Sequence, residues 1–305
     1  MKMKTSYSLF NRQKVLVALL HALGGKVSNL DFQKLLFLYC REVEVEPSYE
    51  FVPYHFGAFS FTSYADRRKL MERGLLAEDN DVWALTDAGH EIAETLGTES
   101  DAISDFVKQH RRLRGNALIA ETYRRYPYYG IQSQIAEKVL RGDAKAQKDI
   151  RAARPAKSKP GLATIGYEGR TLEAYLNILL EDGVTLLCDV RRNALSRKYG
   201  FSKGTLSKGC EGVGIRYEHL PELGIDSKFR KDLSTQESYD RLFDQYECDV
   251  LPQQTDALGI IAEWVARGER VALTCYEHLP GHCHRHCVSE ALEQRMGSKY
   301  TAKHL

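Results

Sequence analysis

The chain has 305 residues, of which 43% are hydrophobic and 28% charged, and its formal net charge is +2. This length allows two hydrophobic cores, and so small a net charge argues neither for nor against a nucleic-acid partner. No apolar run approaches the roughly 18 residues of a membrane span, and residues 1–7 lack the apolar core of a secretion signal. We therefore expect a cytoplasmic protein with no membrane partner. The seven cysteines lack the spacing of a disulfide framework, so we expect reduced thiols.

The N-terminal part has the apolar periodicity of helices over residues 15–20 and 30–39. Residues 70–77 and 82–89 predict a recognition-type helix that ends at Gly74 and a short hairpin that ends at Thr86. Thr86 or Asp87 then caps the next helix, because its side-chain oxygen can accept from free N–H groups. With these residues the segment resembles a winged-helix module, and residues 32–39 and 54–60 resemble the SocA-like, antitoxin-associated domains. Winged helices contact nucleic acid or serve as protein interaction modules.

Basic residues in this part are candidates for contacts to the phosphates of DNA or RNA, which supply most non-specific affinity. On the predicted recognition helix the candidates are Arg67, Arg68, Lys69 and Arg73. Residues 105–129 add Arg111, Arg112, Arg124 and Arg125, interleaved with tyrosines that can stack on bases. The alternatives are a solvated helix face and a connecting helix whose tyrosines pack between domains.

Residues 141–160 interrupt the apolar periodicity with Gly142, Pro155 and alternating Ala and Lys, so they predict a linker. After it, strands at 162–165, 185–190 and 271–274 alternate with helices at 172–180, 256–266 and 288–295, which indicates βαβ units. We predict an α/β protein: a winged-helix domain over 1–100, a helical connector and basic linker over 101–160, and a three-layer, Rossmann-like parallel-sheet domain over 161–305.

Polar side chains follow three of the predicted strands of this second half. Because parallel strands end at one edge, Gly166, Asp189 and Cys275 should lie side by side there. We expect catalytic carboxylates among Glu168, Asp189 and Glu277, by acid or base chemistry. The substrate-binding candidates are Tyr167, Arg191, Tyr217, Glu222, Cys275, Cys283, His284 and Arg285, of which Arg191, His284 and Arg285 can hold a phosphate or carboxylate. In the alternative interpretation Asp189 caps a turn, Glu222 is a loop tip, and Cys275 and the tyrosines belong to the core.

From residue 163 to about 295 the chain resembles a widespread bacterial family known as domain of unknown function 488. The resemblance rests on residues 164–168, 187–191, 201–202, 217–224, 275–277 and 283–285, in this order. It implies a compact α/β domain with these polar residues gathered at one end of the sheet, and it implies no activity.

The soft ligands between Cys275 and Cys287 also raise the question of a metal. Cys283 to Cys287 and His278 to His282 imitate zinc spacings, but the family resemblance includes Cys283-His284-Arg285 and not His286 or Cys287, so we expect no metal and no cofactor. A Cys275 thiolate near Arg285 would be typical of cysteine phosphatases, although the loop between the two is too long for a tight anion loop.

The leading functional hypothesis is a hydrolase that acts on a nucleotide or modified base in DNA or RNA, of the glycosylase or nuclease class, in DNA repair or antiviral (phage) defence. The first alternative is a non-catalytic sensor of a nucleotide or modified base. The second is a cysteine-dependent phosphatase or redox enzyme. DNA or RNA is the expected partner, and the sequence leaves a homodimer open.

Overall fold

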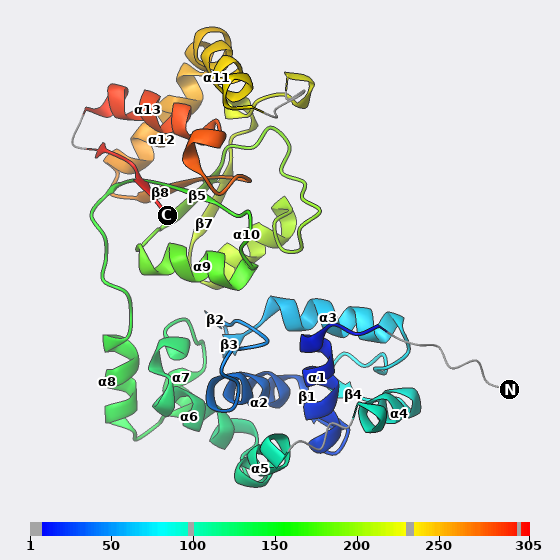
Figure 1. Cartoon of the computed structure of the whole chain (residues 1–305). Helices are drawn as coiled ribbons and strands as arrows, with labels where there is room; N and C mark the ends of the chain where they lie inside the picture. Colours follow the sequence, from blue (N-terminus) through cyan, green and yellow to red (C-terminus); the bar gives the residue numbers. More distant parts are fainter. Residues whose placement is uncertain (1–7, 97–100, 230–234, 298–299) are drawn as a thin grey trace, which may run out of the picture. The chain divides into compact units, whose positions relative to one another are not determined.

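The computed structural model describes residues 8–96, 101–229, 235–297 and 300–305. Residues 1–7, for which we predicted no secretion signal, lie outside this range. The chain divides into two compact units, Met1–Arg154 (unit 1) and Pro155–Leu305 (unit 2) (Figure 1). Each unit has a hydrophobic core of its own. Within the described residues, none of the helices combines the length and the apolar character that a membrane crossing requires.

Unit 1 is mainly helical. Its elements are α1 (Asn11–Ala22), β1 (Lys26–Ser28), α2 (Asn29–Glu42), β2 (Val52–Tyr54), β3 (Gly57–Phe59), α3 (Phe61–Glu72), β4 (Val82–Ala84), α4 (Asp87–Thr95), α5 (Asp101–His110), α6 (Gly115–Arg125), the 3-10 turn η1 (Pro127–Gly130), α7 (Ala136–Val139) and α8 (Ala144–Ala152). The helix α2 is central to the core, because Phe32 and Phe37 are fully buried and the ring of Phe32 packs on Trp83 at 4.6 Å. Phe106 of α5 joins the same core.

Two local predictions for this unit require correction. The hairpin expected to end at Thr86 is reduced to a single bridge between Leu76 and Leu85, because β4 pairs with β1 instead. The segment 141–160 is not a linker throughout, since α8 lies within it. Asp143 caps α8 by accepting from the backbone N–H of Ala146, and the Ala and Lys residues of this segment have high helix propensity. The predicted cap at Thr86 is confirmed, because its side chain accepts from the N–H of Gly89.

Unit 2 contains a five-stranded sheet with the order β7-β6-β8-β5-β9, in which every neighbouring pair is parallel. Its elements are β5 (Gly161–Gly166), α9 (Leu172–Glu181), β6 (Leu186–Asp189), α10 (Lys203–Gly212), β7 (Arg216–His219), η2 (Pro221–Leu223), η3 (Ser227–Phe229), α11 (Gln236–Gln245), the π-helix η4 (Tyr246–Val250), η5 (Leu251–Gln253), α12 (Thr255–Ala266), β8 (Arg270–Cys275), η6 (Pro280–His282), α13 (Arg285–Met296) and β9 (Lys303–His304). The predicted α/β class, with a parallel sheet after a mainly helical N-terminal part, is confirmed.

Helices cover both faces of this sheet. Figure 1 shows α9 and α10 on one face and α12 and α13 on the other. The strands β5 and β6 are buried along their whole length and β8 along all but its first residue, and a parallel sheet covered on both faces requires such continuous apolar runs. The chain therefore leaves β5 and β6 toward one face and leaves the intervening β8 toward the other. In open α/β sheets, ligands bind at the carboxyl ends of the strands beside such a reversal.

Candidate functional site

The carboxyl ends of β5, β6, β7 and β8 meet at one edge of the sheet, which we call the carboxyl edge. Gly166 pairs with Cys275, and Asp189 lies between Thr274 and His219. The expectation that Gly166, Asp189 and Cys275 end neighbouring strands is therefore confirmed. The polar side chains of this edge are held by these four strands and by the loops that follow them.

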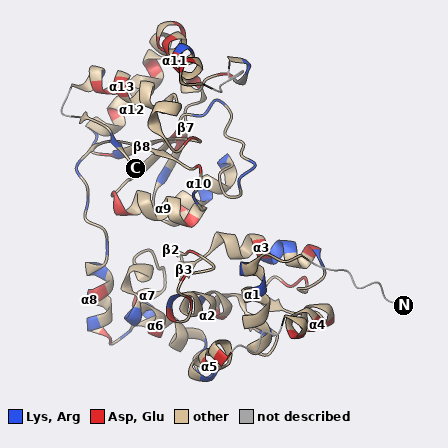
Figure 2. Ribbon diagram, viewed as in Figure 1, with Lys and Arg blue, Asp and Glu red and all other residues tan. Residues whose placement is uncertain are grey.

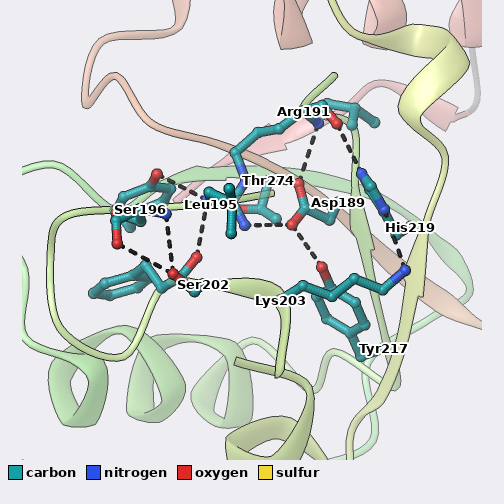
Figure 3. Close-up of polar contacts among 12 residues, drawn as sticks. Asp189, Arg191, Leu195, Ser196, Ser202, Lys203, Tyr217, His219 and Thr274 are labelled. Carbon is teal, nitrogen blue, oxygen red and sulfur yellow. Dashed lines mark hydrogen bonds and ion pairs between the residues drawn. The ribbon is translucent and has the colours of Figure 1, made fainter. Parts of the chain in front are cut away.

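A buried ion pair occupies the end of β6 (Figure 3). The carboxylate of Asp189 accepts from Nε of Arg191 at 2.8 Å, from its Nη2 at 2.5 Å and from its backbone N–H at 3.1 Å. Asp189 is fully buried and Arg191 is 6% exposed. Burial alone would lower the pKa of Arg191, but the hydrogen bonds and the charge of Asp189 raise it above its usual value. Arg191 therefore stays charged although it is buried.

Two tyrosines complete the surroundings of this pair. Tyr217 donates its hydroxyl to Asp189 at 2.6 Å, and Nη1 of Arg191 donates to the hydroxyl of Tyr167 at 2.8 Å. Burial and the charge of Asp189 raise the pKa of Tyr217. The ring of Tyr167 stacks on Phe201 with centroids 4.4 Å apart, and both rings are buried. Tyr167 and Tyr217 therefore orient the ion pair, and the buried Tyr167 ring is not open to a base.

These contacts change the roles expected for the pair. With four hydrogen bonds to its carboxylate and no exposed surface, Asp189 holds Arg191 and Tyr217 and does not face solvent as a general base would. Arg191 also donates to the carbonyl oxygen of Phe201 at 2.9 Å. The guanidinium expected to bind a phosphate is thus engaged by protein atoms.

A second arginine is engaged in the same way on the β8 side. Arg285 begins α13, is 1% exposed, and donates to the carbonyl oxygens of Glu277 at 2.5 Å and His278 at 2.8 Å. It fixes the loop after β8, and it presents no open face to a phosphate. Gly166 permits the close approach of this loop, because a Cβ atom there would lie 1.8 Å from the carbonyl oxygen of Glu277.

Glu168 is an exposed carboxylate at this edge. Its Oε2 accepts from the backbone N–H of His278 at 3.0 Å, and its other oxygen accepts no hydrogen bond from the residues that the structure describes. Lys198 lies nearby and donates to the carbonyl oxygen of Tyr167 at 3.1 Å. Desolvation lowers the pKa of Lys198, and the charge of Glu168 opposes this change. The ring of Tyr276, which is 44% exposed, packs edge-on against Tyr167.

The predicted cysteines and histidine lie immediately behind this edge. The Sγ of Cys275 donates to Glu277 at 3.4 Å and lies 3.8 Å from Nδ1 of His284. The Nε2 of His284 lies 2.9 Å from the carbonyl oxygen of Val190. Cys283 is buried beside them, and burial together with Cys275 raises its pKa well above the usual value.

Glu222, by contrast, lines a separate cavity of about 310 Å³ next to α11, together with Arg192 and Asp226.

Several residues of the edge were not predicted from the sequence. His219 has a polar partner at each ring nitrogen (Figure 3). Its Nε2 lies 2.8 Å from the carbonyl oxygen of Arg191, and its Nδ1 lies 3.4 Å from Nζ of Lys203. Lys198 was also missed, because nothing in its local sequence marks it. Tyr276 lies within the family resemblance at 275–277 but was given no role.

The basic residues of unit 1 fall into different environments. Arg67 is buried and donates to the carbonyl oxygens of Asp79 and Val82, which gives it a structural role in place of the expected phosphate contact. Arg68 and Lys69 are exposed on α3, where Figure 2 shows a group of basic residues. Arg73 donates to the carbonyl oxygen of Ser8. Arg111 and Arg112 are exposed. Arg124 forms an ion pair with Asp143, and Arg125 forms one with Glu42.

Comparisons with known proteins add one finding. No curated protein and no solved structure matches the chain. The family match begins at Thr171, three residues after Glu168, and ends at Leu292 within α13, so it includes Asp189, Arg191 and the cysteines behind the carboxyl edge. Residues 171–292 of unit 2 match the family described as domain of unknown function DUF488.

Proposed function

We propose that unit 2 is a hydrolase that acts on a nucleotide or modified base in DNA or RNA, and that basic residues of unit 1 contact the polymer. The observation that carries this proposal is the exposure and anchoring of the Glu168 carboxylate. It is an exposed carboxylate at a topological switch point, with one oxygen anchored by the N–H of His278 and a lysine beside it. An anchored carboxylate within reach of solvent suits a general base that activates water.

The surrounding residues have distinct roles in this proposal. Lys198 replaces Arg191 and Arg285 as the contact for an anionic group, because both arginines are buried in protein contacts. The exposed ring of Tyr276 offers a stacking surface for a base or sugar. Asp189 and Arg191 act as positioning residues that hold the ends of β5 and β6 in place. Glu277, fixed through its backbone by Arg285, is the second carboxylate of the edge.

The experiment incubates the full chain with labelled single-stranded and double-stranded DNA and RNA, including oligonucleotides with modified bases. We expect product from the wild-type protein, and a loss of at least about 100-fold for Glu168→Gln, which is the low end of what a positioned acid or base contributes. The matched control is Glu181→Gln, an exposed glutamate at the end of α9. Tight binding without product from any substrate would refute the hydrolase and favour the non-catalytic sensor.

The contribution of unit 1 is tested by the salt dependence of binding. Exposed cations that bind phosphates release counterions, so Arg68→Ala with Lys69→Ala should reduce the slope of log K against log salt by about one for each phosphate that is no longer neutralised. Lys145→Ala on α8 is the control, because it removes an exposed cation outside the predicted set. An unchanged slope in the double variant would exclude α3 from the interface.

A further inference from the structure

Three soft ligand atoms converge behind the carboxyl edge. The Sγ atoms of Cys275 and Cys283 and a ring nitrogen of His284 all lie within 4.8 Å of one another, and the three residues are 1%, 1% and 0% exposed. Neither cysteine forms a disulfide in the described part of the chain. We propose that Cys275, Cys283 and His284 bind one Zn²⁺ ion. This inference does not depend on the proposed reaction.

The distances suit a tetrahedral ion. With Zn–S near 2.3 Å and Zn–N near 2.0–2.1 Å, the S···N edge of a tetrahedron is about 3.6 Å. The Sγ of Cys275 lies 3.8 Å from Nδ1 of His284, so the pair needs to move by only a few tenths of an ångström. The ligands come from rigid positions, since Cys275 ends β8 and His284 directly precedes α13.

The contact of His284 to the backbone supports the same site independently. Nε2 lies 2.9 Å from the carbonyl oxygen of Val190, and a carbonyl can only accept, so Nε2 carries the proton. In the neutral ring Nδ1 then has a lone pair, and this atom faces Cys275. Histidines that bind metals almost always donate their other N–H to a carbonyl or carboxylate in this way. The ring is thus fixed in the tautomer that a metal ligand requires.

The chemistry of the donor set favours zinc. Binding deprotonates both thiols, so one Zn²⁺ exchanges for two protons that pass to solvent, and the two thiolates neutralise the ion. Two thiolates with an imidazole are a soft set, which zinc prefers over magnesium or calcium. Glu277 accepts from Sγ of Cys275 at 3.4 Å but does not belong to this group, so the fourth position of the tetrahedron falls to water.

A second group of potential ligands serves as the internal comparison. Glu247, His286 and Cys287 also lie within 4.8 Å of one another, but this group contains a single sulfur and an exposed glutamate. The pairing suggested by sequence spacing, Cys283 with Cys287, does not occur in either group. The number of sulfur ligands therefore distinguishes the two sites.

The experiment measures zinc in the full chain after reduction with a phosphine and addition of one equivalent of Zn²⁺, followed by gel filtration. We expect about one zinc per chain, with X-ray absorption showing two sulfur atoms near 2.3 Å and nitrogen near 2.0–2.1 Å. Wild-type protein alone answers this question, so the result does not depend on whether any variant folds. The proposal would be overturned if the protein retained no zinc or if the first shell contained one sulfur. It would also be overturned if a Cys275–Cys283 disulfide resisted the phosphine.

Variants then assign the ligands. Cys283→Ser should weaken zinc binding by more than the roughly 10–100-fold that loss of an outer-shell partner costs. Cys287→Ser and Cys248→Ser should retain zinc, because Cys287 belongs to the second group and Cys248 is an exposed thiol outside both. Zinc lost from Cys287→Ser but retained by Cys283→Ser would place the ion in the second group and refute this assignment. Since no substrate is used, this result is distinct from the outcome of the hydrolase assay.

Discussion

Replacement of Asp189 by asparagine tests the role given to the buried ion pair. The substitution removes the negative charge opposite Arg191, which is 6% exposed, and leaves an amide where the carboxylate accepted four hydrogen bonds. Breaking a buried pair by removing one partner costs about 3–5 kcal/mol, because the other charge stays buried without compensation. With a urea m-value of about 2 kcal/mol per molar, the unfolding midpoint of unit 2 should fall by about 1.5–2.5 M.

The assay follows urea unfolding by the fluorescence of Trp264, which lies on α12 of unit 2. The chain has two tryptophans, so a Trp83→Phe background makes the signal specific to unit 2. The double variant Asp189→Leu with Arg191→Met removes both charges and should lose much less stability than Asp189→Asn, because no unpaired charge remains. A midpoint shift below about 0.5 M for Asp189→Asn, or a double variant as unstable as the single one, would refute the reasoning.

Three further predictions concern single residues. Gly166→Ala should destabilise unit 2 by about 1–3 kcal/mol in thermal unfolding, because the added Cβ would lie 1.8 Å from the carbonyl oxygen of Glu277. The control Gly204→Ala should be neutral or stabilising, because the space around Gly204 is open. Tyr217→Phe should cost about 1.5–3 kcal/mol in urea unfolding, because it removes a hydrogen bond to a charged group; an unchanged midpoint would contradict this. Burial lowers the pKa of Lys34 from 10.5 to about 7, so the unfolded chain binds the extra proton between these values. The unfolding free energy of unit 1, compared with that of Lys34→Met, should therefore fall as the pH drops from about 10 to 7. Equal slopes of unfolding free energy against pH for the two proteins would contradict this prediction.

The sequence predicted the central strands of unit 2 and the meeting of their ends, because buried parallel strands are continuous apolar runs. It did not reveal β7, whose residues Arg-Tyr-Glu-His are polar, since β7 lies at the edge of the sheet and remains partly exposed. The two-residue β9 is too short to give a periodic signal. In the predicted linker, the alternation of Ala and Lys was attributed to a flexible segment although these residues favour a helix.

The positions of the site residues were easier to predict than their roles. Arg191 and Arg285 lie at the carboxyl edge, but the carbonyl oxygens that engage them belong to Phe201 and His278, in neighbouring loops, and no sequence pattern reveals these contacts. The same holds for Cys275 and His284, which the loop after β8 brings together although their spacing matches no zinc motif. Tertiary contacts, which have no local signature, decide whether such a side chain faces solvent or the protein.

The order of the strands has a consequence for biosynthesis. The strand β8 lies between β6 and β5 but follows both in the chain, and Gly161 pairs with Arg270. Pairing between such distant segments is slow, because a long loop must close before any contact forms. The ribosome therefore releases β5 and β6 well before the strand that joins them, and their apolar edges stay open during that interval. Unit 2 should need protection by a chaperone most while residues 190–270 emerge.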